Sequence, residues 1–487
     1  MHPLYRQRRG AVLLHPTSLP GPLPRGQICH DAYRFIEWLQ ECGIGVWQML
    51  PLGPTHQDGS PYLALSAHAG DPTLISLDWL QDRHLLPERP AVTDYQTHQQ
   101  QLEQAWKQFH HRKDRTLLSA WQAFVVNESD WLEDYSLFMA IREQQGQLPW
   151  HRWPVALRDR DNTALKLARE TLVERIEFHR FCQFVFFQQW QDLKAYAEER
   201  EVLLFGDMPI YVSYDSADVW AQRELFTLDS QGNPQQVAGV PPDYFSDTGQ
   251  RWGNPLYQWE IMAQDHFQWW QRRLQTQLQL FDIVRIDHFR GLQAYWSIPA
   301  EAETAIEGHW VDAPGAELLA ALHTAFPDLP LVAEDLGMIT EEVHALREAF
   351  DLPGMKILQF AFDGDPDNSY LPHQHEFRSL VYTGTHDNDT SLGWYRQLPA
   401  ETQNYVLDYL GLETDREMPW PLIRSALASV SCLAVIPMQD LLSLDSEHRM
   451  NTPGTMEGNW QWRFDWEQLP ADLSQKLRHL LHLYGRL

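Results

Sequence analysis

The chain has 487 residues, of which 44% are hydrophobic and 21% are charged. This is an ordinary globular composition, which excludes intrinsic disorder, and the length is enough for a large buried core. The 66 acidic residues outnumber the 38 basic ones, so the formal charge is −28. A surface of that sign repels nucleic acid and anionic lipid, and we expect neither a nucleic-acid nor a membrane partner.

Eight short segments are apolar almost throughout, which is typical of parallel strands that are buried on both faces. In chain order they are residues 11–15, 46–50, 202–207, 283–287, 331–335, 355–360, 380–387 and 432–438. Apolar residues recur at helical spacing between them, as in residues 31–42 and 178–193. Eight strands that alternate with helices predict an α/β fold, the (β/α)8 TIM barrel, with a doubly wound open sheet as the alternative.

Two connections between these segments are much longer than one loop and one helix require. The first follows the second predicted strand, and we expect residues 55–175 to form a large, mainly helical inserted subdomain within a single catalytic domain spanning 1–487. The second predicted insertion is residues 208–280. Its residues 237–257 are rich in Gly, Pro and aromatic residues, which favours an ordered covering loop.

The cysteines and the N-terminus indicate the compartment. The four cysteines form no CxxC pair and are too scattered for a zinc site, so we expect reduced, structural thiols. The N-terminal residues lack the apolar segment of a signal peptide, and no stretch approaches ~18 uninterrupted apolar residues. We therefore expect a cytoplasmic protein.

Three acidic residues stand at the ends of predicted strands, namely Asp287, Glu334 and Asp387. The carboxyl ends of barrel strands open onto one face, so we expect the three carboxylates to meet in one pocket. Two carboxyl groups about 5–5.5 Å apart are suited to retaining glycosyl transfer, in which one attacks the anomeric carbon and the other donates a proton. The aromatic residues, 12% of the chain and including 21 Trp, suit the apolar faces of sugar rings.

The two roles need carboxyl groups with different pKa values. Arg285 lies two residues before Asp287 on the same face of its strand, and its charge would keep a nucleophilic carboxylate ionised. Burial beside other carboxylates would keep a proton on Glu334, as a general acid requires. We expect Asp387, together with His386, to hold sugar hydroxyls and to help distort the ring.

Several strings of residues then point to one family. In chain order they are LLHPTSLPG (13–21), LPLGPT (50–55), SPY (60–62), GDMPIYV (206–212), residues 237–257, VRIDHFRG (284–291), AEDLG (333–337), FAFDGDPDNSYLPH (360–373), YTGTHDND (382–389) and RMNTPGTMEGNWQWR (449–463). Together they closely resemble the signature regions of the 4-α-glucanotransferases, the amylomaltase or disproportionating-enzyme family of the α-amylase clan. The resemblance extends from residue 13 to residue 463.

The resemblance implies a role for each matching residue. Asp287 would be the nucleophile, Glu334 the general acid/base and Asp387 the stabiliser of the transition state. The resemblance also implies a set of substrate-binding residues, which are Tyr62, Asp207, Asp243, Phe245, Trp252, Arg285 and His386. Those between 243 and 252 resemble the loop that covers the cleft and shapes its acceptor side.

The reaction implied is the transfer of α-1,4-glucan segments to glucose or a maltooligosaccharide, without a cofactor or a metal. No HExxH, P-loop, GxGxxG or GxSxG string is present, so no nucleotide or metal cofactor is expected. The nearest alternative is an α-1,4-glucan hydrolase on the same barrel. A divalent-metal enzyme is a second rival, because the acidic and histidine residues could also bind a metal, and a catalytically silent glucan-binding protein is a third. The sequence leaves the oligomeric state open.

Overall fold

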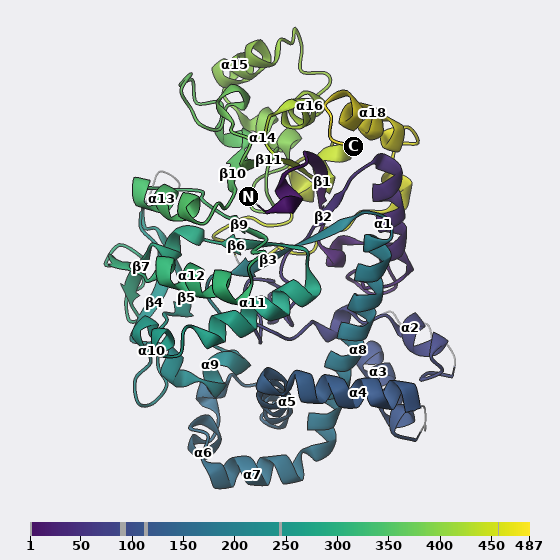
Figure 1. Cartoon of the computed structure of the whole chain (residues 1–487), viewed down its shortest axis with the longest axis vertical. Helices are drawn as coiled ribbons and strands as arrows, with labels where there is room; N and C mark the ends of the chain where they lie inside the picture. The colour runs from purple at the N-terminus through teal and green to yellow at the C-terminus, as the bar shows by residue number, and fades with distance from the viewer. Residues whose placement is uncertain (1, 88–93, 112–114, 243–245, 456) are drawn as a thin grey trace.

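The computed structural model describes residues 2–487 apart from 88–93, 112–114, 243–245 and 456. At its centre lies an eight-stranded parallel sheet (Figure 1). In order around the sheet, the strands are β10 (Gly354–Ile357), β11 (Ser379–Tyr382), β12 (Leu433–Pro437), β1 (Arg9–Leu13), β2 (Val46–Gln48), β3 (Leu203–Pro209), β6 (Ile283–Asp287) and β9 (Leu331–Ala333). The Ala333 amide donates to the Pro353 carbonyl at 3.0 Å, which joins the two edges. The α/β class and the (β/α)8 barrel are therefore confirmed, and the open-sheet alternative is wrong.

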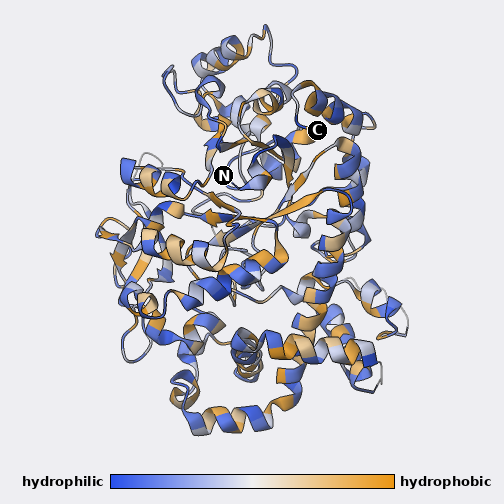
Figure 2. Cartoon of the chain, viewed as in Figure 1, coloured by the Kyte–Doolittle hydropathy of each residue, from blue (hydrophilic) through white to orange (hydrophobic). Residues whose placement is uncertain are grey.

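The strands are largely apolar because both of their faces are buried. In β1, Ala11 and Leu13 belong to the cluster that fills the barrel, whereas Val12 belongs to the larger cluster between the strands and the helices. Figure 2 shows hydrophobic residues concentrated in the central strands and hydrophilic residues on the outward sides of the helices. The polar alternation of a half-exposed sheet is consequently missing from these segments.

Helices surround the barrel. Helix α1 (His30–Cys42) buries Phe35, Ile36 and Leu39 and ends at Gly43, whose φ of 78° is the left-handed conformation that glycine adopts readily. The other helices that follow barrel strands are α11 (Gln268–Leu280), α12 (Gly315–Ala325), α13 (Glu341–Ala349), α14 (Ser391–Gln397), α15 (Ala400–Leu410), α16 (Trp420–Ala428), α17 (Met438–Leu441) and α18 (Leu473–Leu483). No helix in the described part of the chain has the length and apolar content needed to cross a membrane.

A helical region separates β2 from β3. Its helices are α2 (Leu77–Asp82), α3 (Tyr95–His111), α4 (Arg115–Asn127), α5 (Ser129–Gln144), α6 (Val155–Arg158), α7 (Asn162–Thr171) and α8 (Val173–Glu198). Helices α4 to α7 lie at the end of the molecule away from the barrel strands, and α8 leads back to β3 (Figure 1). The grouping of residues 55–175 into one inserted subdomain remains a prediction.

A second sheet follows β3 and differs from the loop that we expected over residues 237–257. Four antiparallel strands lie in the order β5 (Gln250–Pro255), β4 (Gln236–Val240), β7 (Ala294–Pro299) and β8 (His309–Asp312). Short helices α9 (Ala217–Ala221) and α10 (Trp259–Gln264) flank its first two strands in the chain. Gly239 faces Trp296 across β4 and β7, and a Cβ on this glycine would lie only 2.2 Å from the Gln250 carbonyl oxygen. The glycine therefore serves a close strand contact, and it does not mark a loop.

Candidate active site

An arginine ties the ends of two neighbouring barrel strands together. Asp287 ends β6, and its Oδ1 lies 2.9 Å from Nη2 of Arg285 on the same strand. Nη1 of Arg285 donates to Oδ2 of Asp207, which faces Arg285 in the register of β3 and β6. The Arg285 side chain is only 6% exposed, so its charge acts on both carboxylates with little screening by water. The structure thus brings these three sequence-predicted residues together.

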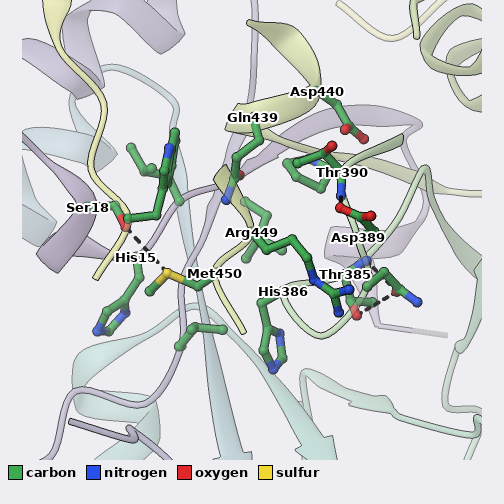
Figure 3. A pocket seen from close by; sticks show the side chains of 16 residues that line it. His15, Ser18, Thr385, His386, Asp389, Thr390, Gln439, Asp440, Arg449 and Met450 are labelled. Atoms are coloured by element: carbon green, nitrogen blue, oxygen red, sulfur yellow. Dashed lines mark hydrogen bonds between the residues drawn. The ribbon is translucent and has the colours of Figure 1, made fainter. Parts of the chain in front are cut away.

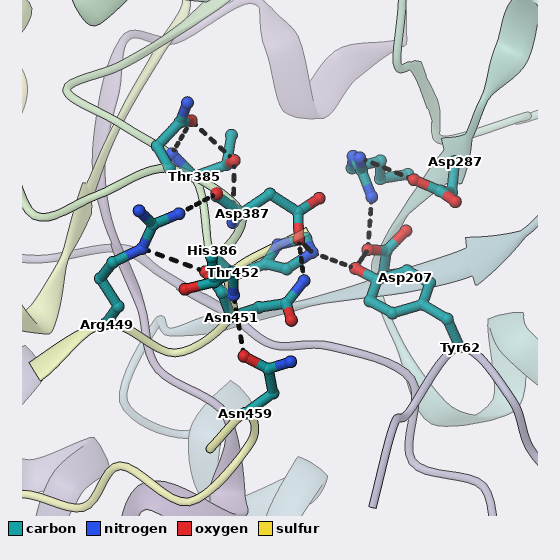
Figure 4. A network of polar contacts seen from close by, with 12 residues as sticks. Tyr62, Asp207, Asp287, Thr385, His386, Asp387, Arg449, Asn451, Thr452 and Asn459 are labelled. Carbon is teal, nitrogen blue, oxygen red and sulfur yellow. Dashed lines mark hydrogen bonds and ion pairs between the residues drawn. The ribbon is translucent and has the colours of Figure 1, made fainter. Parts of the chain in front are cut away.

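Tyr62 and His386 extend this network to Asp387, as Figure 4 shows. The Tyr62 hydroxyl donates to Oδ2 of Asp207 at 2.7 Å and lies 2.9 Å from Nε2 of His386. Because the single Tyr62 proton is already used, the Nε2–H of a neutral His386 must donate to the hydroxyl oxygen. Nε2 of His386 also lies 3.3 Å from Oδ1 of Asp387, which lies in the loop after β11. Burial lowers the pKa of His386, in agreement with its neutral form.

Glu334 follows β9 and is held beside Asp287 by backbone amides. Its Oε2 accepts a hydrogen bond from the backbone amide of His288 at 2.6 Å, and its Oε1 accepts one from that of Leu336 at 3.0 Å. Burial raises the pKa of Glu334 to about 7, although Arg285 and the two amides oppose the shift. Burial also raises the pKa of Asp287, and there the ion pair with Arg285 is the main opposing effect.

This arrangement predicts how the rate depends on pH. If Glu334 must carry a proton in order to donate it, kcat/KM for an oligosaccharide donor falls as the pH rises through about 7. We expect a tenfold loss for each further pH unit well above that value. A pH–rate profile measured between about pH 5 and 9 checks this, and a rate that stays level up to pH 9 would contradict the assignment of the acid.

Asp335, the residue after Glu334, makes contacts on the other side of the chain. It points away from Glu334, and its carboxylate accepts the Met355 amide at 2.7 Å and pairs with Arg347 at 3.2 Å. The Arg347 and Asp335 side chains are both almost fully buried. This carboxylate therefore holds β9 to its neighbours and takes no part in the cluster at the barrel mouth.

Trp252 in β5, which belongs to the predicted covering segment of residues 237–257, contacts a residue next to Asp287. The Trp252 ring packs edge-on against the His288 ring, with centroids 4.8 Å apart. His288 has a φ of 53°, a left-handed conformation, and its backbone amide donates to Glu334. Sequence reasoning gave His288 no role in glycosyl transfer and considered it only as a possible ligand in the rival metal enzyme. The predicted binding residues Asp243 and Phe245 lie outside the described residues.

The segment after β12 also contacts the site. None of its residues was predicted to belong to the site. Nδ2 of Asn451 donates to Oδ1 of Asp387 at 2.7 Å, and Nη2 of Arg449 donates to the Asp387 carbonyl at 2.9 Å. Trp460 packs at 5.9 Å from the Tyr62 ring. The string at residues 449–463 was the only signal, and it marked a region without assigning a role to any of its residues.

A cavity lies beside the loop that follows β11. His15, His386, Arg449 and Met450 contribute to its lining (Figure 3). His386 is therefore shared between this cavity and the carboxylate network. Within the part of the chain that the structure describes, no group of three or more His, Cys, Asp or Glu residues is arranged to hold a metal ion.

Comparison with known proteins agrees with this geometry. The family model described as 4-alpha-glucanotransferase matches residues 14–468. The chain belongs to this family. A 4-alpha-glucanotransferase of Thermus thermophilus is 48% identical over 96% of each chain, and one of Synechocystis is 47% identical over 99% of this chain and 98% of the relative. The amylomaltase from Streptococcus agalactiae in complex with acarbose superimposes with a TM-score of 0.94 at 38% identity, covering 99% of this chain and all of that one.

These findings confirm the resemblance inferred from the strings of residues. The chain is an enzyme of the 4-alpha-glucanotransferase family, and the family and its relatives support transfer and not the hydrolase alternative. The roles of the individual residues are inferred from their contacts at the barrel mouth.

Proposed function

We propose that this enzyme moves α-1,4-glucan segments from a maltooligosaccharide or starch-like donor to glucose or another maltooligosaccharide. The observation that carries the proposal is the polar network at the barrel mouth. It links Asp287 through Arg285, Asp207, Tyr62 and His386 to Asp387, while Glu334 accepts the amide of the residue after Asp287. Three carboxyl groups from three strand ends are thereby available to one sugar ring.

The first step forms a covalent intermediate. A carboxylate oxygen of Asp287 attacks the anomeric carbon, the bond from that carbon to the glycosidic oxygen breaks, and Glu334 gives its proton to that oxygen. The shortened glucan leaves with a free 4-hydroxyl group. Arg285 favours an ionised Asp287, while the burial of Glu334 favours its protonated form. The Asp387 carboxylate would stabilise the positive charge that develops on the ring.

The second step reverses the roles. Once Asp287 is esterified its charge is gone, so ionisation of Glu334 is no longer opposed by that neighbour, and Glu334 accepts the proton of the acceptor 4-hydroxyl. The acceptor oxygen attacks the same carbon and Asp287 leaves as a carboxylate. Two inversions at one carbon retain the anomeric configuration.

We assign substrate binding to residues on both sides of these carboxylates. Tyr62, Asp207, Arg285 and His386 would line the donor sugar. The acceptor side would be formed by the covering segment with Asp243, Phe245 and Trp252. An acceptor sugar must outcompete water at ~55 M, so this side has to position the hydroxyl and hinder water.

Replacement of Trp252 tests the acceptor side. Trp252→Ala removes an indole that packs on His288, which itself holds Glu334, so water gains access to the ester intermediate. We expect the ratio of transfer to hydrolysis to fall roughly tenfold, with a smaller loss in donor cleavage. Chromatography of the products from maltotriose measures both. Trp310→Ala is a matched control, because Trp310 lies on β8 of the same sheet and packs against Arg290. An unchanged product ratio would remove Trp252 from this role.

The whole reaction is tested with purified protein and maltotriose, with and without EDTA. We expect a ladder of longer maltooligosaccharides together with glucose, at the same rate in both samples. Shorter products alone would indicate a hydrolase, loss of activity in EDTA would indicate the metal enzyme, and no products would indicate the silent binding protein.

We further propose that the enzyme acts in the cytoplasm, in maltodextrin or glycogen metabolism. All four cysteines are free and buried, as is usual for proteins of a reducing compartment. Fractionation of the source cells, followed by an assay of each fraction with maltotriose, tests the location. Activity in the culture medium or in the envelope fraction would contradict it.

A further inference from the structure

The segment from Arg449 to Trp460, which follows the last barrel strand, approaches the loop that carries Asp387. Asn451 belongs to this segment, and its side-chain amide donates to Oδ1 of Asp387 at 2.7 Å. The same oxygen lies 3.3 Å from Nε2 of His386 (Figure 4). One carboxylate oxygen of Asp387 therefore has two nitrogen neighbours, and the contacts described at this carboxylate leave the other oxygen for the substrate.

Arg449 aligns the two segments without touching the carboxylate. Its Nη2 donates to the backbone carbonyl of Asp387 at 2.9 Å, and its Nε donates to the backbone carbonyl of Asn451 at 3.2 Å. One planar guanidinium thus bridges the two backbones from which the Asp387 and Asn451 side chains extend. This bridge sets the distance across which the amide meets the carboxylate.

Further hydrogen bonds stabilise the segment itself. The Thr452 amide donates to Oδ1 of Asn459 at 2.9 Å, and Nδ2 of Asn459 donates to the Thr455 carbonyl at 3.0 Å. The Trp460 amide donates to the Met450 carbonyl at 2.7 Å. The position of Asn451 is consequently defined by its own segment and not only by its contact with Asp387.

We propose that Asn451 is a positioning residue that holds the Asp387 carboxylate in its reactive orientation, with Arg449 fixing the two backbones. This inference rests on the proposed role of Asp387. A neutral amide is suited to the task because it restricts the carboxylate without cancelling its charge. A lysine or arginine at position 451 would form an ion pair there, and it would reduce the negative charge available to an oxocarbenium-like transition state.

The first test is Asn451→Ala. We expect kcat for maltotriose disproportionation to fall roughly 10- to 100-fold while KM changes less than about threefold, because the misplaced carboxylate acts mainly in the transition state. Thr455→Val is the matched control. It removes a hydroxyl of the same segment that donates to the Thr452 carbonyl at 2.7 Å and accepts from Nδ2 of Asn459 at 3.1 Å. The hydroxyl has no contact with Asp387, and Asn459 keeps its bond to the Thr455 carbonyl. We expect Thr455→Val to leave kcat within about twofold of the parent.

The second test is Asn451→Asp, which separates positioning from a general structural role. Two facing carboxylates repel each other at high pH, whereas a shared proton at low pH restores a donor between them. We expect the ratio of variant to parental kcat to rise at least about fivefold from pH 8 to pH 5. For Asn451→Ala this ratio should stay level across the same range.

Two outcomes would overturn the proposal. One is an Asn451→Ala enzyme that keeps more than half of the parental kcat. The other is an Asn451→Asp enzyme whose rate ratio stays as level with pH as that of Asn451→Ala. Asp387→Asn, measured in parallel, identifies which idea has failed. An active Asp387→Asn enzyme removes the proposed role of Asp387, whereas an inactive one beside a normal Asn451→Ala enzyme removes only the role of Asn451.

Discussion

Asp287→Ala is expected to lower kcat for maltotriose disproportionation by at least about 10⁴-fold, because the variant lacks the carboxylate to which we assign the covalent ester. The variant should still bind maltooligosaccharides, since Tyr62, Asp207 and Arg285 keep their contacts with one another. Initial rates from the product ladder and calorimetric titration with maltotriose measure the two quantities.

Detection of the covalent glycosyl ester identifies the nucleophile directly. Mass spectrometry of the quenched parent enzyme with an activated maltosyl fluoride should show a glycosylated peptide containing Asp287. Asp335→Asn is a suitable control, because it alters a buried carboxylate near the site that pairs with Arg347. We expect it to lower the stability by about 1–3 kcal/mol while the folded enzyme keeps its kcat within a few-fold. A folded Asp287→Ala enzyme with near-normal turnover would exclude Asp287 as the nucleophile.

Glu334→Gln is expected to lower transfer from maltotriose by about 10³-fold or more, because the leaving oxygen no longer receives a proton. Fluoride leaves without a proton, so a maltosyl fluoride donor should restore the first step. The ester should then accumulate, since the second step lacks its base. If the variant uses maltotriose and maltosyl fluoride with equal losses, Glu334 is not the general acid.

The same substitution should change how stability depends on pH. Burial raises the pKa of Glu334 from 4.5 in the unfolded chain to about 7 in the folded one, so the folded state binds its proton more tightly. Its contribution to stability is complete below pH 4.5 and is lost as the pH rises through about 7. Glutamine does not titrate.

The free energy of unfolding of Glu334→Gln, relative to that of the parent, should therefore increase between pH 4.5 and 7, by an amount on the order of 3 kcal/mol. Urea unfolding of both proteins at about pH 5 and pH 8 measures this difference. The substitution also weakens the hydrogen bonds from two backbone amides, which changes the unfolding free energy by the same amount at every pH. Comparing the difference between variant and parent at the two pH values removes this constant contribution. A difference that stays constant with pH would show that Glu334 has an ordinary pKa.

The barrel and the positions of its acidic residues could be predicted from local sequence patterns. Strands buried on both faces are mostly apolar, and this is a local property that can be recognised without knowing their partners. The predicted segment 283–287 coincides with β6, and residues 46–50 and 432–438 contain β2 and β12. Because the polar end of each strand marks the barrel mouth, Asp287, Glu334 and Asp387 could be grouped before any contact was known.

The hairpin of β4 and β5 was decided by tertiary structure alone. Its glycines and prolines have the local composition of a loop, and it becomes part of a sheet only because β4 pairs with β7, which follows β6 in the chain. A Cβ on Gly239 would also collide with the Ile298 side chain of β7, which is distant in the chain. No periodicity within the segment reports such a partner.

The surroundings of the carboxylates were also decided only by the tertiary structure. Asn451 meets Asp387 from 64 residues away, and the His288 amide meets Glu334 from 46 residues away. Local patterns identify residues that can ionise, whereas their pKa values and orientations depend on burial and on donors supplied by other segments. The sequence therefore indicated the groups to which we assign the chemistry, whereas the packing of distant segments specifies the surroundings in which those groups are held.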